Sequence, residues 1–315
     1  MELYNKILNG YLSNKNDLMP LIDLDIDTLC KYADNIRKHF CGSRFDICTI
    51  INGKSGKCPE DCKYCAQSSH YKTNCAEYPL ISQKEIEKDS LYNESKGIMH
   101  YSVVTSGRKL NKEEIKSLCS IYRHLSKTLK INLCASHGLL EGDDFTLLHN
   151  SGIKRYHNNL ETSANFFKNI CTTHSQEDKI KTIKAAQKAG LEICSGGIMG
   201  LGESMEDRID MALQLRELNV ASVPINILNP IKNTPLEQNK ILAPDEVRRI
   251  TAIYRFALPD KIIKIAGGRG LLPDKGKSLF TSGANGAISG DMLTTEGITI
   301  DYDFKMLRSI GYEFD

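Results

Sequence analysis

Three cysteines stand at a spacing that suits metal chemistry. Cys58, Cys62 and Cys65 form a C-x3-C-x2-C run. Three thiolates can hold three irons of a cubane cluster and leave the fourth iron without a protein ligand, and an open coordination position separates a reacting metal site from a structural one. A structural zinc site is the alternative, but no His or Cys stands at the C-x2-C spacing that would complete a second pair of ligands. The run therefore predicts a 4Fe-4S cluster with one open iron.

Composition narrows the class of protein. The chain has 315 residues and 11 cysteines, and its N-terminus lacks a basic segment leading into an apolar one. An odd cysteine count without a secretion signal disfavours a disulfide scaffold, so a soluble cytoplasmic protein is expected. The formal charge is +2 with no dense basic run, which does not indicate a nucleic-acid partner. No apolar run approaches the ~18 residues that span a bilayer, so no membrane association is expected.

The elements that must position the three cysteines alternate between strand and helix patterns. Helical patterns begin at Asn111, Ser175 and Pro244 and fall between short apolar runs. Such alternation implies parallel strands, and eight units predict an α/β fold of the (β/α)8 barrel type, with an open doubly wound sheet as the alternative. We expect a helical N-terminal extension over 1–45 and a barrel with a C-terminal helix over 46–315. The predicted strands cover 46–51, 100–106, 131–136, 155–160, 192–198, 222–228, 262–267 and 284–289.

The cysteine run resembles that of the radical S-adenosylmethionine enzymes. It follows the first predicted strand, where barrel enzymes place their chemistry. The resemblance implies that the open iron binds S-adenosylmethionine, that one electron cleaves this cofactor to a 5′-deoxyadenosyl radical, and that Tyr64 lies by the adenine. Removal of a hydrogen atom by a radical suits a C–H bond that offers no acidic proton to a base.

Further segments across most of the chain are similar to the biotin synthase family. They are CPEDCKYC at 58–65 followed by Gln67, YHNNLETS at 156–163, ICSGGIMGLGE at 193–203, SVPINIL at 222–228, TPL at 234–236 and MLTT at 292–295. The resemblance implies insertion of sulfur between two unactivated carbons of dethiobiotin to form biotin. It also implies an electron donor such as flavodoxin or ferredoxin, and a homodimer.

The same resemblance assigns binding roles to polar and glycine residues. It places Asn159 and Asn226 on the ureido ring of dethiobiotin, and mid-strand asparagines suit an apolar sheet poorly. Glu161 matches an acidic residue near the ribose or the substrate, although the family more often has Asp there and a surface carboxylate is the alternative. Gly196 and Gly197 match backbone near the amino acid portion of the cofactor, where a strand bulge would also need glycine. The pair Thr294 and Thr295 matches residues that bind the valerate carboxylate, with exposed turn threonines as the alternative.

This chain departs from the family at a second cluster. The usual enzyme holds a 2Fe-2S centre, the sulfur donor, with three strand cysteines and an arginine. Cys134 and Cys194 match two of these cysteines, but Ser102 replaces the third and Lys264 replaces the arginine. Cys48, in the middle of the first predicted strand, is a replacement candidate, since inward side chains of neighbouring strands can meet inside a barrel. We therefore hypothesise a larger iron–sulfur cluster with three Cys ligands, whose unliganded iron carries an extra sulfide.

The remaining cysteines and two other functions stay open at this point. Cys41 is a weaker ligand candidate because it precedes the strand. No role follows from the sequence for Cys30, Cys75, Cys119 or Cys171. The altered ligands also allow a related radical enzyme of the same barrel type, such as a hydrogenase maturase or a methylornithine synthase. A non-catalytic iron–sulfur or zinc protein is the third alternative.

Overall fold

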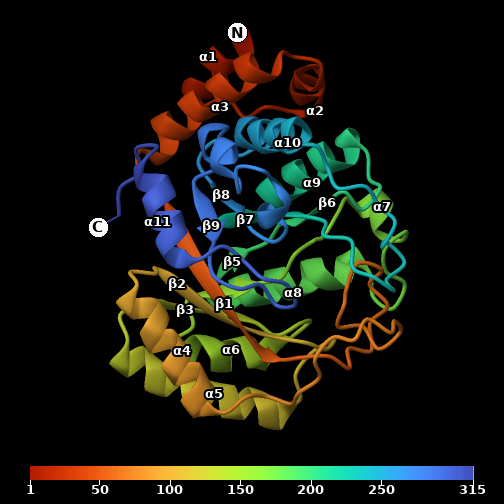
Figure 1. The fold of residues 1–315 in the computed structure, drawn as a ribbon, viewed down its shortest axis with the longest axis vertical. Helices are drawn as coiled ribbons and strands as arrows, with labels where there is room; N and C mark the ends of the chain where they lie inside the picture. Colours follow the sequence, from red (N-terminus) through yellow and green to blue (C-terminus); the bar gives the residue numbers. More distant parts are fainter. Residues whose placement is uncertain (315) are drawn as a thin grey trace.

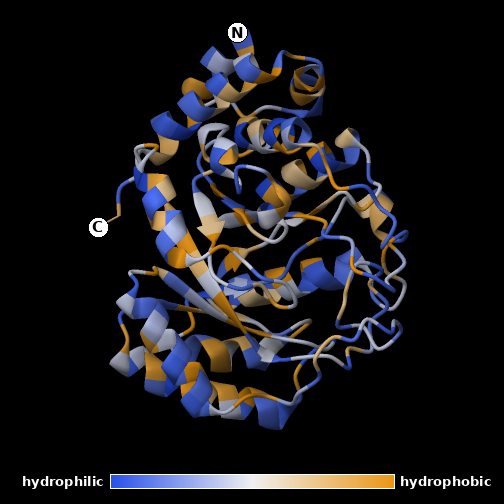
Figure 2. Ribbon diagram, viewed as in Figure 1, coloured by the Kyte–Doolittle hydropathy of each residue, from blue (hydrophilic) through white to orange (hydrophobic). Residues whose placement is uncertain are grey.

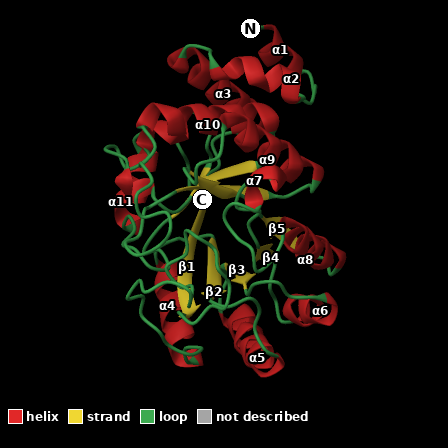
Figure 3. Ribbon diagram, turned by 90° about the vertical axis from the view of Figure 1, so that its right-hand side faces the viewer, coloured by secondary structure: helices red, strands yellow, loops and turns green. Residues whose placement is uncertain are grey.

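The computed structural model describes residues 1–314, which form a closed parallel barrel surrounded by helices (Figures 1 and 3). The strands hydrogen-bond in the order β5-β4-β3-β2-β1-β9-β8-β7-β6, and pairing of β5 with β7 closes the ring. The predicted α/β barrel is therefore confirmed, and the open sheet is excluded. The strands are β1 (Asp46–Lys54), β2 (His100–Thr105), β3 (Asn132–Ser136), β4 (Arg155–His157), β5 (Glu192–Cys194), β6 (Gly197–Met199), β7 (Ser222–Ile227), β8 (Ile262–Ile265) and β9 (Gly286–Ile288).

Two predicted strands differ from the structure. The segment 192–198 is broken into β5 and β6, which together fill one position in the eight-membered ring. The backbone of β7 approaches closely at this break, since a Cβ built on Gly196 would lie 1.9 Å from the carbonyl oxygen of Pro224. Strand β4 ends at His157, so the prediction that Asn159 lies in mid-strand is wrong.

A layer of helices surrounds the barrel (Figure 1). In Figure 2 hydrophilic and hydrophobic residues alternate along these helices, as expected when one face packs on the barrel. Capping boxes begin α5 at Asn111 and α8 at Ser175, because each side chain accepts a hydrogen bond from the backbone three residues on. The helices outside the barrel are α4 (Gln83–Ser95), α5 (Lys112–Thr128), α6 (Gly142–Asn150), α7 (Ala164–Phe167), α8 (Gln176–Lys188), α9 (Met205–Glu217), α10 (Pro244–Ala257) and α11 (Ile300–Arg308), with 3-10 turns η2 (Arg269–Leu271) and η3 (Lys277–Thr281).

Four helical elements precede β1: α1 (Glu2–Leu8), α2 (Lys15–Leu18), η1 (Met19–Ile22) and α3 (Ile26–Cys41). They lie together beside α10 in Figure 1. The hydroxyl of buried Ser13 donates to the carbonyl of Phe256 at 2.9 Å, which ties this segment to the end of α10. The division into an extension and a barrel domain stays a prediction. Among residues 1–314, the helices are all too short or too polar to cross a bilayer.

Candidate active site

A cavity of about 410 Å³ occupies the barrel and opens toward the loops that follow the strands. It brings together most residues that the sequence singled out. The predicted residues that line it are Cys48, Tyr64, Cys65, Ser102, Cys134, Asn159, Glu161, Cys194, Asn226, Lys264, Thr294 and Thr295. Cys58, Cys62, Gly196 and Gly197 do not line it. A cavity lined by convergent polar groups at this end of a barrel is the expected place for catalysis.

The inner part of the cavity carries three thiols from three strands. Cys48, Cys134 and Cys194 come from β1, β3 and β5, and each is at most 8% exposed. Ser102 on β2 pairs in register with Cys134, and its buried hydroxyl has no hydrogen-bond partner among the described residues. An unpartnered buried hydroxyl is costly in a folded protein, so the Ser102 side chain has hydrogen-bonding capacity left for a group in the cavity. We call these four residues the barrel basin.

A buried network of charges lies beside the barrel basin. The Asp46 carboxylate, at the start of β1, is 2.6 Å from Lys264 Nζ, 3.2 Å from Arg155 Nη1 and 3.2 Å from His100 Nε2. Burial favours the neutral acid, but Lys264, His100 and Arg155 outweigh it and hold the pKa of Asp46 well below its usual range. Sequence reasoning missed Asp46, Arg155 and His100. Charged residues inside predicted strands were the available signal, since such residues are rarely buried unless paired.

The three basin thiols differ in acidity. Burial raises the pKa of Cys48 to about 11. Burial also opposes ionisation of Cys194, but His157, Lys264 and Arg155 together outweigh it and lower the pKa of that thiol to about 7. The thiolate is the form that binds metal, so Cys194 is the thiol best prepared to do so.

The Cys58–Cys65 loop follows β1 and is held by its own backbone. The amide of Cys58 donates to the carbonyl of Gln67 at 3.0 Å, and the amide of Cys65 donates to the carbonyl of Cys62 at 3.0 Å. The side-chain oxygen of Gln67 accepts from the amide of Gly56 at 3.1 Å. Cys65 and Tyr64 face the cavity, whereas the sulfur of Cys62 lies 3.7 Å from that of Cys171. Soft thiolates at this spacing fit an iron–sulfur cluster.

Polar side chains surround the middle of the cavity, and some of their hydrogen bonds go to the protein backbone. Asn226 donates to the carbonyl of Gly197 at 3.1 Å and accepts from the amide of Gly267 at 3.0 Å. Asn159 accepts from the amide of Gly196 at 3.0 Å. Because a carboxamide has two N–H donors and two acceptor sites, both side chains keep capacity for a ligand.

Glu161 lies in the same wall with a strained backbone. Its φ of 72° is unusual for a residue with a side chain, and such strain concentrates at functional sites. Its carboxylate is 3.8 Å from Nζ of Lys179, a residue of α8 that is 8% exposed and also lines the cavity. Lys179 was missed because it falls within a helical pattern rich in charge.

Gly196 and Gly197 lie where neighbouring backbone leaves no room for a side chain. A Cβ at Gly197 would lie 2.4 Å from the carbonyl oxygen of Glu161, so close strand packing explains both glycines, and contact with a cofactor stays a prediction.

Thr294 and Thr295 line the cavity from the loop after β9. That loop is tied to β1 by Asn52, whose amide donates to the carbonyl of Leu293 at 3.0 Å.

Comparison with known proteins now decides the family. Residues 54–215 match the radical SAM superfamily, and residues 224–313 match the biotin and thiamin synthesis associated domain. Biotin synthase from Clostridium botulinum (strain Loch Maree / Type A3) is 57% identical over 308 residues, which cover 98% of this chain and 97% of that protein. The chain belongs to the biotin synthase family. Another biotin synthase, from Brachyspira hyodysenteriae, is 53% identical over 314 residues, or 100% of this chain and 94% of that protein.

Solved structures share the biotin synthase fold at low sequence identity. Methylornithine synthase superposes with a TM-score of 0.86 at 18% identity, covering 99% of this chain and 97% of that one. The FeFe-hydrogenase maturase from Carboxydothermus hydrogenoformans gives 0.83 at 15% identity, covering 99% of this chain and 78% of that one. These similarities show only a shared fold, whereas family membership rests on the relatives above 50% identity.

Proposed function

We propose that this chain inserts sulfur into dethiobiotin to form biotin. The observation that carries the proposal is the single cavity that joins Cys65 of the Cys58–Cys65 loop to the barrel basin. The full-length identity to biotin synthases supports it. When bound, a 4Fe-4S cluster with S-adenosylmethionine supplies hydrogen-atom abstraction, and a second iron–sulfur cluster supplies sulfide.

The chain's own residues hold these groups at separate places in and around the cavity. We assign the 4Fe-4S cluster to Cys58, Cys62 and Cys65. Tyr64, Glu161, Gly196 and Gly197 then contact S-adenosylmethionine. Asn159 and Asn226 bind the ureido ring, and Thr294 and Thr295 bind the carboxylate at the cavity mouth. This arrangement puts the substrate between the two metal sites, enclosed by strand residues that exclude water.

We assign the second cluster to Cys48, Cys134 and Cys194, with Ser102 and Lys264 beside it. Three thiols fit a cluster larger than the usual 2Fe-2S centre, because three Cys ligands leave an iron of a cubane free for an extra sulfide. Lys264 is engaged with Asp46 at 2.6 Å, so its ammonium acts as a fixed positive charge. Such a charge compensates the thiolates that the metal requires.

Product analysis tests the proposal. Anaerobic incubation with dethiobiotin, S-adenosylmethionine and a strong reductant should give 5′-deoxyadenosine and biotin. Deoxyadenosine that forms slowly and independently of dethiobiotin would contradict biotin synthesis. Absence of deoxyadenosine would favour a non-catalytic metal protein.

We also propose three finer properties that the family relationship supports. The electron donor is a flavodoxin or a ferredoxin, the enzyme works in the cytoplasm, and the active species is a homodimer. Light scattering after anaerobic size-exclusion chromatography tests the last point, and a mass near one chain would contradict it.

A further inference from the structure

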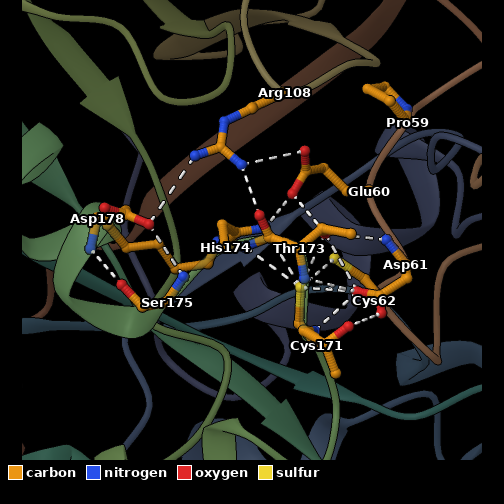
Figure 4. Close-up of polar contacts among 12 residues, drawn as sticks. Pro59, Glu60, Asp61, Cys62, Arg108, Cys171, Thr173, His174, Ser175 and Asp178 are labelled. Atoms are coloured by element: carbon orange, nitrogen blue, oxygen red, sulfur yellow. Dashed lines mark hydrogen bonds and ion pairs between the residues drawn. The ribbon is translucent and has the colours of Figure 1, made fainter.

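Cys62 of the Cys58–Cys65 loop lies outside the cavity, next to two other side chains of metal-ligating type, Cys171 and His174. The sulfur of Cys62 is 3.7 Å from that of Cys171, and the latter is 3.2 Å from Nδ1 of His174. Ligand atoms of all three residues lie within 4.8 Å of one another. Figure 4 shows these side chains converging on one point, although Cys62 is 109 residues away from Cys171 in sequence.

As whole residues, Cys171 is buried and Cys62 and His174 are half-buried, and carboxylate acceptors surround the three side chains. Cys171 is 3% exposed, and the side chains of His174 and Glu60 are 5% and 7% exposed. The carboxylate of Glu60 contacts Nδ1 of His174, and that of Asp61 lies 3.2 Å from the sulfur of Cys171. Carboxylates next to thiols and an imidazole are the surroundings of a cation.

We propose that Cys62, Cys171 and His174 bind one divalent zinc-class cation when the chain carries no 4Fe-4S cluster. Two thiolates and an imidazole are the donors that zinc prefers, and Asp61 or water can fill the fourth position. Sulfurs bonded at about 2.3 Å to a tetrahedral zinc lie about 3.8 Å apart. The observed 3.7 Å between Cys62 and Cys171 meets that requirement without movement.

Cys62 belongs both to the zinc site and to the Cys58–Cys65 loop. We assign the same thiol to the 4Fe-4S cluster in the proposed function, so zinc and the cluster compete for it. Occupation by zinc keeps the cluster-free loop folded against α7 and α8 and delays cluster assembly until the metal leaves. The zinc site itself does not depend on the catalytic activity of the enzyme.

Zinc titration of the full-length, cluster-free protein tests the site. The double variant Cys58→Ser/Cys65→Ser removes the other thiols of the loop and keeps Cys62. Under anaerobic reducing conditions it should compete with a chromophoric chelator for zinc. Adding Cys171→Ser or His174→Ala should weaken this binding by at least about 100-fold, since loss of a direct ligand exceeds the 10–100-fold effect of outer partners. The barrel basin is unchanged in every variant, so the differences report only this site.

A control variant, a cobalt spectrum and a check of folding accompany the zinc titration. Cys119→Ser removes another buried cysteine, on α5, and should leave zinc affinity unchanged. Cobalt should give thiolate charge-transfer absorption that Cys171→Ser diminishes, and circular dichroism verifies folding of each variant. The site is overturned if the double variant binds no zinc, or if Cys171→Ser and His174→Ala leave its affinity unchanged.

Competition is measured separately as the rate of cluster assembly on the chain with unaltered loop cysteines. Added zinc should slow assembly, and Cys171→Ser should restore the rate. An assembly rate that zinc does not change would overturn the competition. Failure of biotin formation would leave the zinc titration intact, so the two proposals fail independently.

Discussion

The Cys58–Cys65 loop and the barrel basin are both groups of thiols, but they are built in different ways. The loop places its cysteines within eight consecutive residues and is held by local backbone hydrogen bonds. The barrel basin takes Cys48, Cys134 and Cys194 from three strands, and its thiols are nearly inaccessible. The loop thiols are only partly buried. A loop can exchange ligands and admit a cofactor, whereas a barrel wall holds its ligands at set positions.

The largest expected effect is loss of the loop cluster. Cys65→Ala should abolish S-adenosylmethionine cleavage and lower biotin formation by more than about 100-fold, because a ligand of the open-iron cluster is gone. Iron content and deoxyadenosine release measure this. The basin iron should remain, and simultaneous loss of both clusters would show that the two regions are not independent.

Cys48→Ala tests the barrel basin, because it should remove the second cluster and leave the loop cluster in place. Biotin formation and the iron and sulfide of the second cluster should fall, while cleavage of S-adenosylmethionine persists at the loop. Iron and sulfide analysis after anaerobic reconstitution measures the change, with Cys119→Ala as the buried control. An unaltered second cluster would remove Cys48 from the ligands.

The charges beside the basin should make Asp46→Asn strongly destabilising. Removing the carboxylate leaves the ammonium of Lys264 buried without its ion-pair partner, while Arg155 keeps Glu192 at 3.0 Å. Leaving one buried charge unpaired costs about 3–5 kcal/mol in the free energy of unfolding. The exposed pair of Lys96 and Asp301 is the control, and Asp301→Asn should cost no more than about 1 kcal/mol. Urea unfolding of cluster-free protein compares the two, and equal losses would refute the special role of the basin charges.

Protonation of His137, in the barrel wall next to the basin, should lower the free energy of unfolding in acid. Burial lowers the pKa of His137 to about 3, and its ring lies between the hydroxyls of Thr105 and Tyr122. Because the unfolded chain binds this proton below a pH of about 6.5, stability falls as the pH falls through that value toward 3. Between pH 7 and pH 5 the loss is about 2 kcal/mol. His137→Gln should flatten the pH profile of urea unfolding, and an unchanged slope would contradict the assignment.

The smallest effect is expected at the mouth of the cavity. Thr294→Val should raise the KM for dethiobiotin by about 10-fold, the equivalent of one hydrogen bond, with little change in kcat. Thr281→Val, in η3 and outside the cavity, should leave KM unchanged. Steady-state kinetics at saturating S-adenosylmethionine separate the two variants. A change confined to kcat would move Thr294 from substrate binding to another role.

Much of the fold and of the candidate site could be predicted from the sequence. Alternation of apolar runs with capped helical patterns predicted the barrel, because hydrophobic periodicity and capping residues act over a few positions. The Cys58–Cys65 motif was legible for the same reason. Cys134, Cys194 and Lys264 entered through family resemblance, and the structure lines one cavity with all three.

Only the tertiary structure decided which distant residues meet. Barrel closure brings Asp46 to Lys264 and Arg155, and the packing of the loop after α7 brings Cys171 to Cys62. The close approach of β7 at Gly196 explains why one predicted strand is two. Contacts between residues more than 100 positions apart depend on strand register and on helix packing, which no local pattern encodes. The sequence by itself determined which cysteines are contiguous candidate ligands, and the closed barrel determined their neighbours.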